Sequence, residues 1–362
     1  MGLLRFEEAY LERIWGGEKL RTLYGKPIPP NTSIGEAWLI ADHPQHESVV
    51  AEGPHRGRTL RSLLEENPRE VLGGQPRLTI HGRFPLLLKI LDANDLLSVQ
   101  VHPDDACAAQ LGEHDVGKSE MWHVLQADPH SEIICGLKPD VTPERLLDAL
   151  RVSGAVSLEP AACSRQPSAS DPVVHLMHRF EVAEGTSVFV PAGTVHAIGA
   201  GVVLAEIQQN SNLTYRLYDW QRVDASGKPR PLHVERALKA IHFGFRVSGL
   251  GSWVSGPPAT LLQPPASPPT TNLSASSLSS FSVPLARCPH FAAEYVQVHK
   301  TWERTVMDET FHIVLVKAGP LTFATDEDEM SLCAGQAVLV PGSLSRFLVR
   351  GTGSLLDYYV AV

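Results

Sequence analysis

Three short stretches of the sequence carry side chains able to bind a metal ion. The first, Ser98-Val99-Gln100-Val101-His102-Pro103, follows an apolar run over 84–91, and its pattern predicts the end of a buried strand. Because successive strand side chains point to opposite faces, Gln100 and His102 share one face. Pro103 cannot donate to a ladder, so the strand should end there. An imidazole beside an amide oxygen is half of a metal site; the alternative is a core histidine with satisfied hydrogen bonds.

The other two stretches supply a carboxylate and a second imidazole. In 118–125, Glu120 and Trp122 share a strand face, so Glu120 can point inward. In 188–198, an apolar run and a Pro-Ala-Gly turn precede His196, an order similar to the second metal motif of a cupin barrel. Two histidines and a carboxylate leave coordination positions open and suit a catalytic zinc, or equally a non-haem iron. Gln100 is a candidate fourth ligand.

A second group of candidates is cationic. Lys89 lies inside the apolar run, where burial is costly without an anionic partner. Arg216, next to Tyr215, offers a rigid fork for an oxyanion or a phosphate. Lys118 stands two residues before Glu120. The alternative for all three is an ordinary salt bridge to the excess carboxylates of the chain.

Composition indicates a globular protein with two domains. The chain has 362 residues, 43% hydrophobic and 20% charged. A net charge of −9 argues against nonspecific binding to nucleic acid. No apolar window approaches the roughly 18 residues of a membrane span, and the N-terminus does not look like a signal peptide. Five scattered cysteines argue against a disulfide framework and a cysteine-bound zinc, so we expect a cytoplasmic protein.

The elements that must position these residues are mostly short strands. We expect helices over 59–72, 143–150 and 233–242, and strands over 84–102, 118–125, 133–137, 179–182, 188–198 and 202–207. A segment rich in Pro and Ser over 247–285 is a predicted linker. Beyond it, Val338-Leu339-Val340-Pro341-Gly342 repeats the pattern of Val188-Phe189-Val190-Pro191-Ala192, with Arg346 in place of His196. This predicts a second, degenerate copy of the first domain.

The motifs together resemble the short bacterial type-I phosphomannose isomerase (mannose-6-phosphate isomerase) family. They occur in the family's order and cover roughly residues 5 to 245. The segments that carry the resemblance are Trp15-Gly16-Gly17, Gly35-Glu36-Ala37-Trp38, Phe84 to Lys89, Leu97 to Asp104, Gly117 to Trp122, Val190 to Ala197, Gln209-Asn210-Ser211 and Thr214-Tyr215-Arg216. Asn212 departs from the family pattern, the linker is longer than expected and the C-terminal part matches weakly.

The resemblance implies a mainly β fold of cupin-type (jelly-roll) β-barrels with a few peripheral helices. It implies a catalytic cupin domain over 1–246 with helical insertions, and a degenerate cupin-like domain over 286–362. It also implies one Zn²⁺ per chain and interconversion of mannose 6-phosphate and fructose 6-phosphate through a metal-stabilised cis-enediol. The implied ligands are Gln100, His102, Glu120 and His196. The implied catalytic residues are Arg216, Lys118 and Glu206, and the implied substrate-binding residues are Lys89, Ser98 and Trp15.

Other interpretations stay open at this point. The same ligands suit an Fe(II)-dependent cupin oxygenase, and a non-catalytic cupin that binds a sugar phosphate is a third possibility. The proton-transfer base is Glu206, a water on the metal, a histidine or Lys118. His123, His175 and His178 are interpreted as structural. The expected partner is a small sugar phosphate, not nucleic acid or membrane, and the protein is expected to be a monomer or homodimer.

Overall fold

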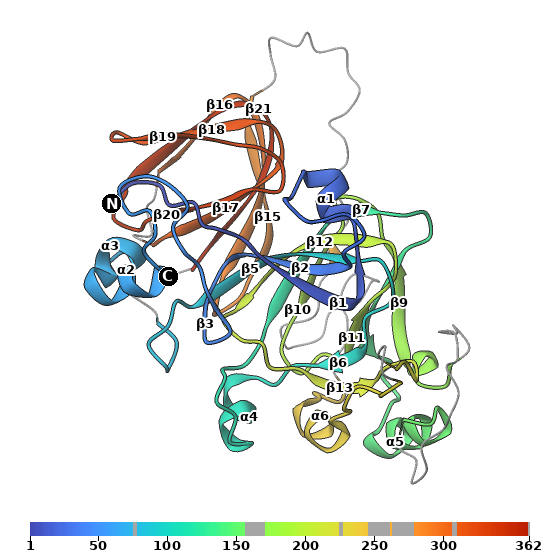
Figure 1. The fold of residues 1–362 in the computed structure, drawn as a ribbon. Helices are drawn as coiled ribbons and strands as arrows, with labels where there is room; N and C mark the ends of the chain where they lie inside the picture. The colour runs from blue at the N-terminus through green and yellow to red at the C-terminus, as the bar shows by residue number, and fades with distance from the viewer. Residues whose placement is uncertain are drawn as a thin grey trace.

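The computed structural model describes residues 1–74, 78–155, 171–223, 227–244, 261–262, 279–305 and 310–360. Strands make up most of it, and helices lie at the periphery (Figure 1). A first, N-terminal group of strands builds two facing sheets, and a C-terminal group builds a third (Figure 1). The mainly β character predicted from the sequence is therefore confirmed.

The larger N-terminal sheet has seven strands, paired antiparallel throughout. Their order is β1 (Ala9–Gly17), β2 (Ile34–Ile40), β5 (Leu86–Ala93), β12 (Val202–Gln209), β7 (Glu120–Ala127), β10 (Ser187–Val190) and β14 (Leu261–Leu262). The facing sheet has the order β13 (Tyr215–Tyr218), β6 (Val99–Val101), β11 (His196–Ile198), β8 (Glu132–Leu137) and β9 (Met177–Glu181). A small hairpin joins β3 (Asp42–His43) to β4 (His46–Glu47).

Side chains of the two N-terminal sheets meet in one buried cluster. Trp122 and Val124 of β7 pack there with Ile133 of β8 and Ile198 of β11. Since side chains alternate along a strand, Met121 of β7 faces the opposite side and joins a different core. Burial on both faces explains why these strands are near-continuous apolar runs. The predicted strand region 84–102 divides into β5 and β6, which lie in different sheets.

The third sheet has its own core and is coloured orange to red in Figure 1. Its main path is β15 (Phe281–Arg287), β16 (Ala292–Thr305), β21 (Arg346–Tyr359), β17 (His312–Ala318) and β20 (Ala337–Val340). A further hairpin of β18 (Leu321–Ala324) and β19 (Glu329–Leu332) pairs with β21. β15 begins at Phe281, inside the range 247–285 predicted as a linker. Most of that range lies outside the described residues.

The helices begin where the sequence supplies caps. Thr59 caps α2 (Leu60–Glu66), because its side chain accepts a hydrogen bond from the Ser62 amide. The single helix expected over 59–72 is wrong: Pro68 ends α2 and starts a separate α3 (Pro68–Leu72). The other helices are α1 (Lys19–Tyr24), α4 (Asp105–Gln110), α5 (Pro143–Val152), α6 (Val234–Ala240) and the short 3₁₀ turn Val174–Leu176. Within the described ranges, no helix is long and apolar enough to cross a membrane.

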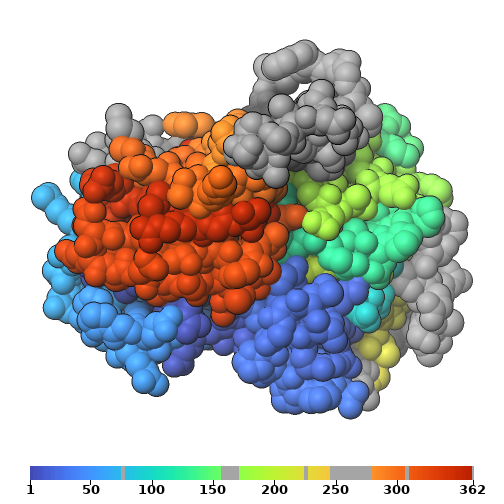
Figure 2. All heavy atoms as spheres, turned by 90° about the horizontal axis from the view of Figure 1, so that it is seen from above, coloured from blue at the N-terminus to red at the C-terminus, as the bar shows by residue number. Residues whose placement is uncertain are grey.

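One hydrophobic core joins the N-terminal and C-terminal strands. Phe84 lies 4.5 Å from Phe311, centroid to centroid, and Phe189 packs edge-on against Phe291 at 6.2 Å. Figure 2 shows the orange and red C-terminal residues in direct contact with blue N-terminal segments. The two predicted domains therefore share one hydrophobic core, in which the N-terminal strands are packed against the C-terminal ones.

Replacing Phe311 tests this shared core. Phe311→Ala should lower the free energy of unfolding by about 3–5 kcal/mol, the usual loss for a buried phenylalanine. Because the core is common to both halves, urea unfolding should remain a single transition. The matched control is Phe281→Ala, since Phe281 is 39% exposed and should change stability by less than about 1 kcal/mol. Two separate transitions, with one unaffected by Phe311→Ala, would contradict the shared core.

Candidate active site and metal centre

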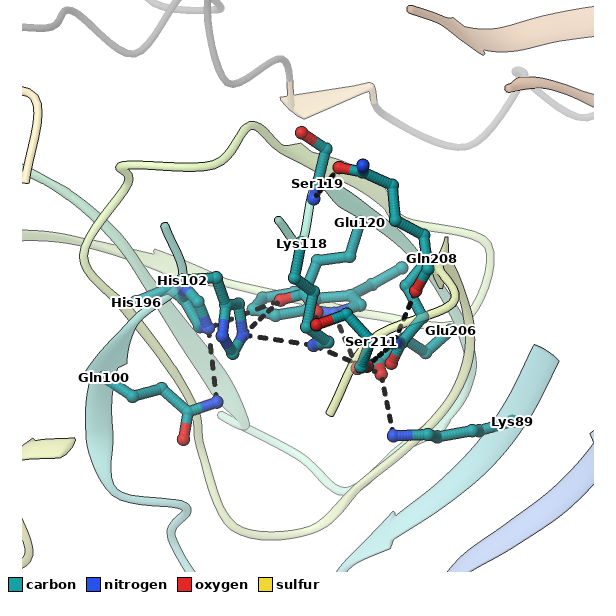
Figure 3. A network of polar contacts seen from close by, with 12 residues as sticks. Lys89, Gln100, His102, Lys118, Ser119, Glu120, His196, Glu206, Gln208 and Ser211 are labelled. Atoms are coloured by element: carbon teal, nitrogen blue, oxygen red, sulfur yellow. Dashed lines mark hydrogen bonds and ion pairs between the residues drawn. The ribbon is translucent and has the colours of Figure 1, made fainter. Parts of the chain in front are cut away.

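The three predicted donors converge between the two N-terminal sheets (Figure 3). Glu120 opens β7 in one sheet, and His196 opens β11 in the other. His102 follows β6, directly after the strand end predicted before Pro103. Glu120 Oε1 lies 3.5 Å from His102 Nε2 and 3.3 Å from His196 Nε2. All donor atoms lie within 4.8 Å of one another, and all three residues are buried.

Hydrogen bonds fix the direction of both imidazole lone pairs. His102 Nδ1 donates to the Leu213 carbonyl at 2.8 Å, and His196 Nδ1 donates to the Thr194 carbonyl at 2.9 Å. The proton therefore sits on Nδ1, and each Nε2 presents its lone pair to the centre. Burial lowers the pKa of His196 to about 3, and burial together with Lys118 lowers that of His102. Both rings are neutral at pH 7, the form that binds metals.

The carboxylate shows that a cation fits this cluster. Glu120 Oε1 is buried and has no hydrogen-bond partner among the described residues. Burial opposes its negative charge, but Lys118 and His102 lower its pKa well below the usual value, so the group stays ionised. An ionised oxygen without a partner is costly in a protein interior. Two neutral imidazoles and this oxygen form a donor set that suits zinc or ferrous iron.

Gln100 lies beside the cluster with its amide nitrogen turned toward it. Its Nε2 is 3.3 Å from His196 Nε2, and its Oε1 accepts a hydrogen bond from Ser98 Oγ at 3.1 Å. The two ends of an amide are close to isosteric, so rotation by 180° presents the oxygen to the centre. Gln100 and His102 both lie beside His196, so their side chains share one face, as expected from the sequence.

Charged side chains of alternating sign extend from the cluster across the larger sheet. Arg13 lies 2.7 Å from Glu36, and Glu36 lies 3.6 Å from Lys89. Lys89 lies 3.7 Å from Glu206, and Glu206 lies 3.6 Å from Lys118. Lys118 donates a short hydrogen bond to Glu120 at the end of the row. This row, which we call the charge ladder, consists of Arg13, Glu36, Lys89, Glu206, Lys118 and Glu120. Lys89 thus has the anionic partners that its burial requires.

The ladder gives its carboxylates different pKa values. Burial opposes ionisation of Glu36, but Lys89 and Arg13 lower its pKa to about 2. For Glu206, burial and the neighbouring Glu120 raise the pKa despite Lys118 and Lys89. Burial disfavours the Lys118 ammonium, yet Glu120 and Glu206 raise its pKa above the ordinary value. A buried carboxylate with a raised pKa takes up a proton more readily than an ordinary one, which suits a general acid or base.

A cavity of about 320 Å³ lies over the ladder. Its lining includes seven residues singled out in the sequence: Trp15, Lys89, Ser98, Gln100, Lys118, Glu206 and Arg216. Arg216 Nε donates to Ser98 Oγ at 3.2 Å, which links the arginine to the Gln100 side. The structure therefore brings the predicted site residues together. Seven of them line this cavity, and His102, Glu120 and His196 form the donor cluster, which Gln100 and Lys118 contact.

Sequence reasoning missed three charged residues of the cavity wall, Arg13, Glu36 and Arg230. Glu36 carried a signal, because it is a carboxylate between apolar neighbours in a strand. Arg13 and Arg230 carried none, since each reaches the cavity only through the pairing of distant segments. His123 lies outside the site: its Nδ1 hydrogen bonds to Ser187 Oγ at 2.8 Å, and burial lowers its pKa to about 3.

The low pKa of His196 makes stability of the metal-free protein depend on pH. Its folded pKa of about 3 is below the unfolded value of about 6.5, so between these values only the unfolded chain takes up the proton. Unfolding free energy should therefore fall as pH falls below about 6.5, by roughly 2 kcal/mol at pH 5 from this residue. The test is urea unfolding of His196→Gln at several pH values with chelator present. The slope of unfolding free energy against pH should decrease by the equivalent of about one proton relative to wild type. An unchanged slope would contradict the assignment.

Comparison with known proteins agrees with this geometry. Residues 3–122 match the family model described as phosphomannose isomerase type I, catalytic domain. A mannose-6-phosphate isomerase of Streptococcus mutans is 39% identical over 244 residues, which cover 67% of this chain and 69% of that protein. The solved structure of mannose 6-phosphate isomerase from Bacillus subtilis superposes with a TM-score of 0.78 at 30% identity, over 99% of both chains.

A more distant solved structure, described as mannose 6-phosphate isomerase bound with zinc and yttrium, has a TM-score of 0.68 at 17% identity and covers the whole of both chains. It shows the same fold, and the cupin-type architecture predicted from the sequence is confirmed by these neighbours. Because the chain is 39% identical to a relative of which it covers more than two thirds, and shares a fold along its full length with a solved relative, it belongs to the mannose-6-phosphate isomerases.

Proposed function

We propose that this protein is a zinc-dependent enzyme that interconverts mannose 6-phosphate and fructose 6-phosphate. The observation that carries the proposal is the unpartnered Glu120 oxygen between two inward-facing imidazoles, at the end of a charge ladder that lines a cavity. One zinc ion per chain would be held by His102, Glu120 and His196, with the Gln100 amide oxygen as fourth ligand after rotation. Bound zinc supplies Lewis acidity toward a substrate oxygen.

Isomerisation moves one proton from C2 to C1 of the open-chain sugar, and one proton from O2 to O1, by way of a cis-enediol. Glu206 is the best-placed base for the carbon-bound proton. Its Oε2 accepts a hydrogen bond from Trp122 Nε1 at 3.2 Å, and its Oε1 faces Lys89 and Lys118 at 3.7 and 3.6 Å. Lys118 would balance charge that develops on O1 and O2.

The remaining cavity residues would hold the sugar phosphate. Arg216 is anchored by Ser98 Oγ and by the Pro231 carbonyl, to which its Nη1 donates at 3.0 Å. This leaves the guanidinium oriented for an oxyanion. Trp15 is 4% exposed and would give the cavity an apolar wall, and Lys89 would bind hydroxyl oxygens. We expect the enzyme to act in the cytoplasm as a monomer or homodimer.

An iron-dependent oxygenase would use the same two histidines and carboxylate. The isomerase is favoured because a charge ladder with a carboxylate of raised pKa serves proton transfer, and because the relatives are named as isomerases. A cupin that only binds sugar phosphates would need neither Glu206 beside the cavity nor its two lysines.

The decisive experiment is a coupled assay of fructose 6-phosphate formation from mannose 6-phosphate. Turnover should disappear after stringent chelation and return with zinc. His102→Ala should lose metal and activity together, because it removes a donor, whereas Arg216→Ala should retain metal and lose turnover. Turnover by protein that is free of metal, or a fully active His102→Ala with a full metal content, would refute the proposed centre.

Glu206→Gln tests the assignment of the base. It keeps the shape and the hydrogen-bonding capacity of the side chain but cannot accept the C2 proton. We expect kcat to fall by about 10²–10⁴-fold with zinc content unchanged, and exchange of the C2 proton with deuterated solvent should slow by the same factor. The same substitution at a surface carboxylate, Glu235→Gln, serves as the control. A Glu206→Gln enzyme within threefold of wild type would move the base role to another group.

A further inference from the structure

The segment just before β7 carries Lys118 and leads directly into Glu120, yet residues 117–119 belong to no helix or strand. Lys118 Nζ lies 3.1 Å from His102 Nε2 and 3.6 Å from Glu206 Oε1, so it stands between the donor cluster and the proposed base (Figure 3). Buried amides outside regular structure need acceptors of another kind. The position of the Lys118 ammonium therefore depends on what holds this backbone.

Two side chains, Asp105 and Gln209, hold the segment and each other; we call this pair the clamp. The Gly117 amide donates to Asp105 Oδ1 at 2.8 Å. The Ser119 amide donates to Gln209 Oε1 at 2.9 Å, and the Gln209 amide donates back to the Ser119 carbonyl at 3.2 Å. Gln209 Nε2 closes the arrangement by donating to Asp105 Oδ1 at 3.1 Å. One buried glutamine thus ties the segment to an aspartate.

The clamp joins two elements that supply the site. Asp105 opens α4 and follows the metal-donor candidate His102 by three residues. Gln209 ends β12 and follows the proposed base Glu206 by three residues. A segment that is bonded to both members of the clamp is therefore set at a fixed distance from both elements. Lys118, which must reach both, lies in the middle of that segment.

Gly117 allows the segment to approach this closely. A Cβ atom on Gly117 would lie 2.4 Å from the Asp105 amide nitrogen and 2.5 Å from the Asp104 carbonyl carbon, closer than any real Cβ contact. At this approach the Lys118 amide donates to the Pro103 carbonyl at 3.0 Å. All three amides of the segment are thus satisfied, and the backbone has no freedom to shift without breaking one of these bonds.

We propose that the clamp acts through the backbone that it holds and so positions Lys118 and Glu120 for catalysis and metal binding. Neither Asp105 nor Gln209 lines the cavity, so both are positioning residues and not catalytic ones. The inference rests on the proposed function, because it concerns how the same centre is held. A displacement of about 1 Å at a reacting group can lower a rate by about 100-fold, so release of the segment should affect turnover strongly.

The first test is Gln209→Leu, which removes the side-chain hydrogen bonds at similar volume. With zinc in excess, kcat should fall by about 10- to 100-fold, because the Lys118 ammonium is displaced. KM should stay within about threefold, since the clamp does not line the cavity. Zinc affinity, measured by competition with a chelator, should fall by about 10- to 100-fold, because Glu120 loses its outer support.

The matched control is Gln297→Leu, in the C-terminal sheet. Gln297 Oε1 accepts from the Tyr295 hydroxyl at 2.7 Å, and its Nε2 donates to the Gly353 carbonyl at 2.8 Å. The same substitution therefore removes two side-chain hydrogen bonds at either site. Gln297→Leu should lower thermal stability, while kcat and zinc affinity stay within twofold of wild type.

Two variants of Asp105 separate geometry from charge. Both hydrogen bonds to Asp105 fall on Oδ1, and an amide oxygen can accept them equally well. Asp105→Asn should therefore keep kcat and zinc affinity within threefold of wild type, whereas Asp105→Ala should show the losses expected of Gln209→Leu. Equal impairment of Asp105→Asn and Asp105→Ala would overturn the clamp, because the charge would then be the property that matters. This pair decides the question if Gln209→Leu does not fold.

The readouts keep this inference distinct from the proposed function. A Gln209→Leu protein with both kcat and zinc affinity within threefold of wild type would overturn the inference, whatever its thermal stability. If wild-type protein binds zinc but does not turn over mannose 6-phosphate, the proposed function fails, and the zinc affinities of the variants still decide whether the clamp supports Glu120. Wild-type protein that binds no zinc would refute the proposed centre, and this inference with it.

Discussion

The structure depends on a single constraint, that charges placed inside a β-barrel must be neutralised by partners. Lys118 and Glu120 are both almost wholly buried, and an unpaired charge at either position would be strongly unfavourable. The larger sheet meets this constraint by placing one charge on each of five neighbouring strands, β1, β2, β5, β12 and β7, while Lys118 lies in the segment just before β7. Lys89 on β5 stands directly opposite Glu206 on β12, and Glu36 on β2 lies diagonally across from Lys89. The charges on these strands thus follow the order of the strands in the sheet. As a result, charged side chains of the sheet line the cavity, and proton transfer is possible there.

The C-terminal half pairs two of its strands in the same register, and its described residues form no comparable cluster of metal donors. Val190 stands opposite Glu120 where β10 meets β7, and Val340 stands opposite His312 where β20 meets β17. The imidazole of His312 therefore stands in the C-terminal half at the register position that Glu120 holds in the N-terminal half. His312 forms a hydrogen bond to the buried Asp357 at 2.8 Å, while Arg346, which takes the place of His196, is exposed and pairs with Asp326. The strand pairing of the C-terminal half serves packing, because residues of its strands complete the shared core.

The donor cluster was predictable from the sequence because it depends on local rules. Strand alternation places Gln100 and His102 on one face, a proline ends their strand, and a tight turn precedes His196. The separation of β5 from β6 into different sheets was not predictable, since periodicity does not identify pairing partners. Pro68 carried a signal for the break between α2 and α3, but apolar spacing across it favoured one helix. Arg13 and Arg230 reach the cavity by tertiary contacts alone, one from an edge strand and one from a loop held by Asp219, and no local pattern marks such residues.

Lys89 separates two carboxylates whose surroundings give them opposite properties. Glu36 receives a hydrogen bond from Trp38 at 2.7 Å and is paired with Arg13 as well as Lys89, so its negative charge is stabilised from three sides. Glu206 also has two lysines and a tryptophan donor, but Glu120 and Glu36 add negative charge on both sides of it. The first group therefore stays ionised as a fixed countercharge, while the second gains affinity for a proton. Two buried glutamates are thus suited to different roles by their neighbours. For this reason the row of charges, and not any one carboxylate, is the unit that the fold has to preserve.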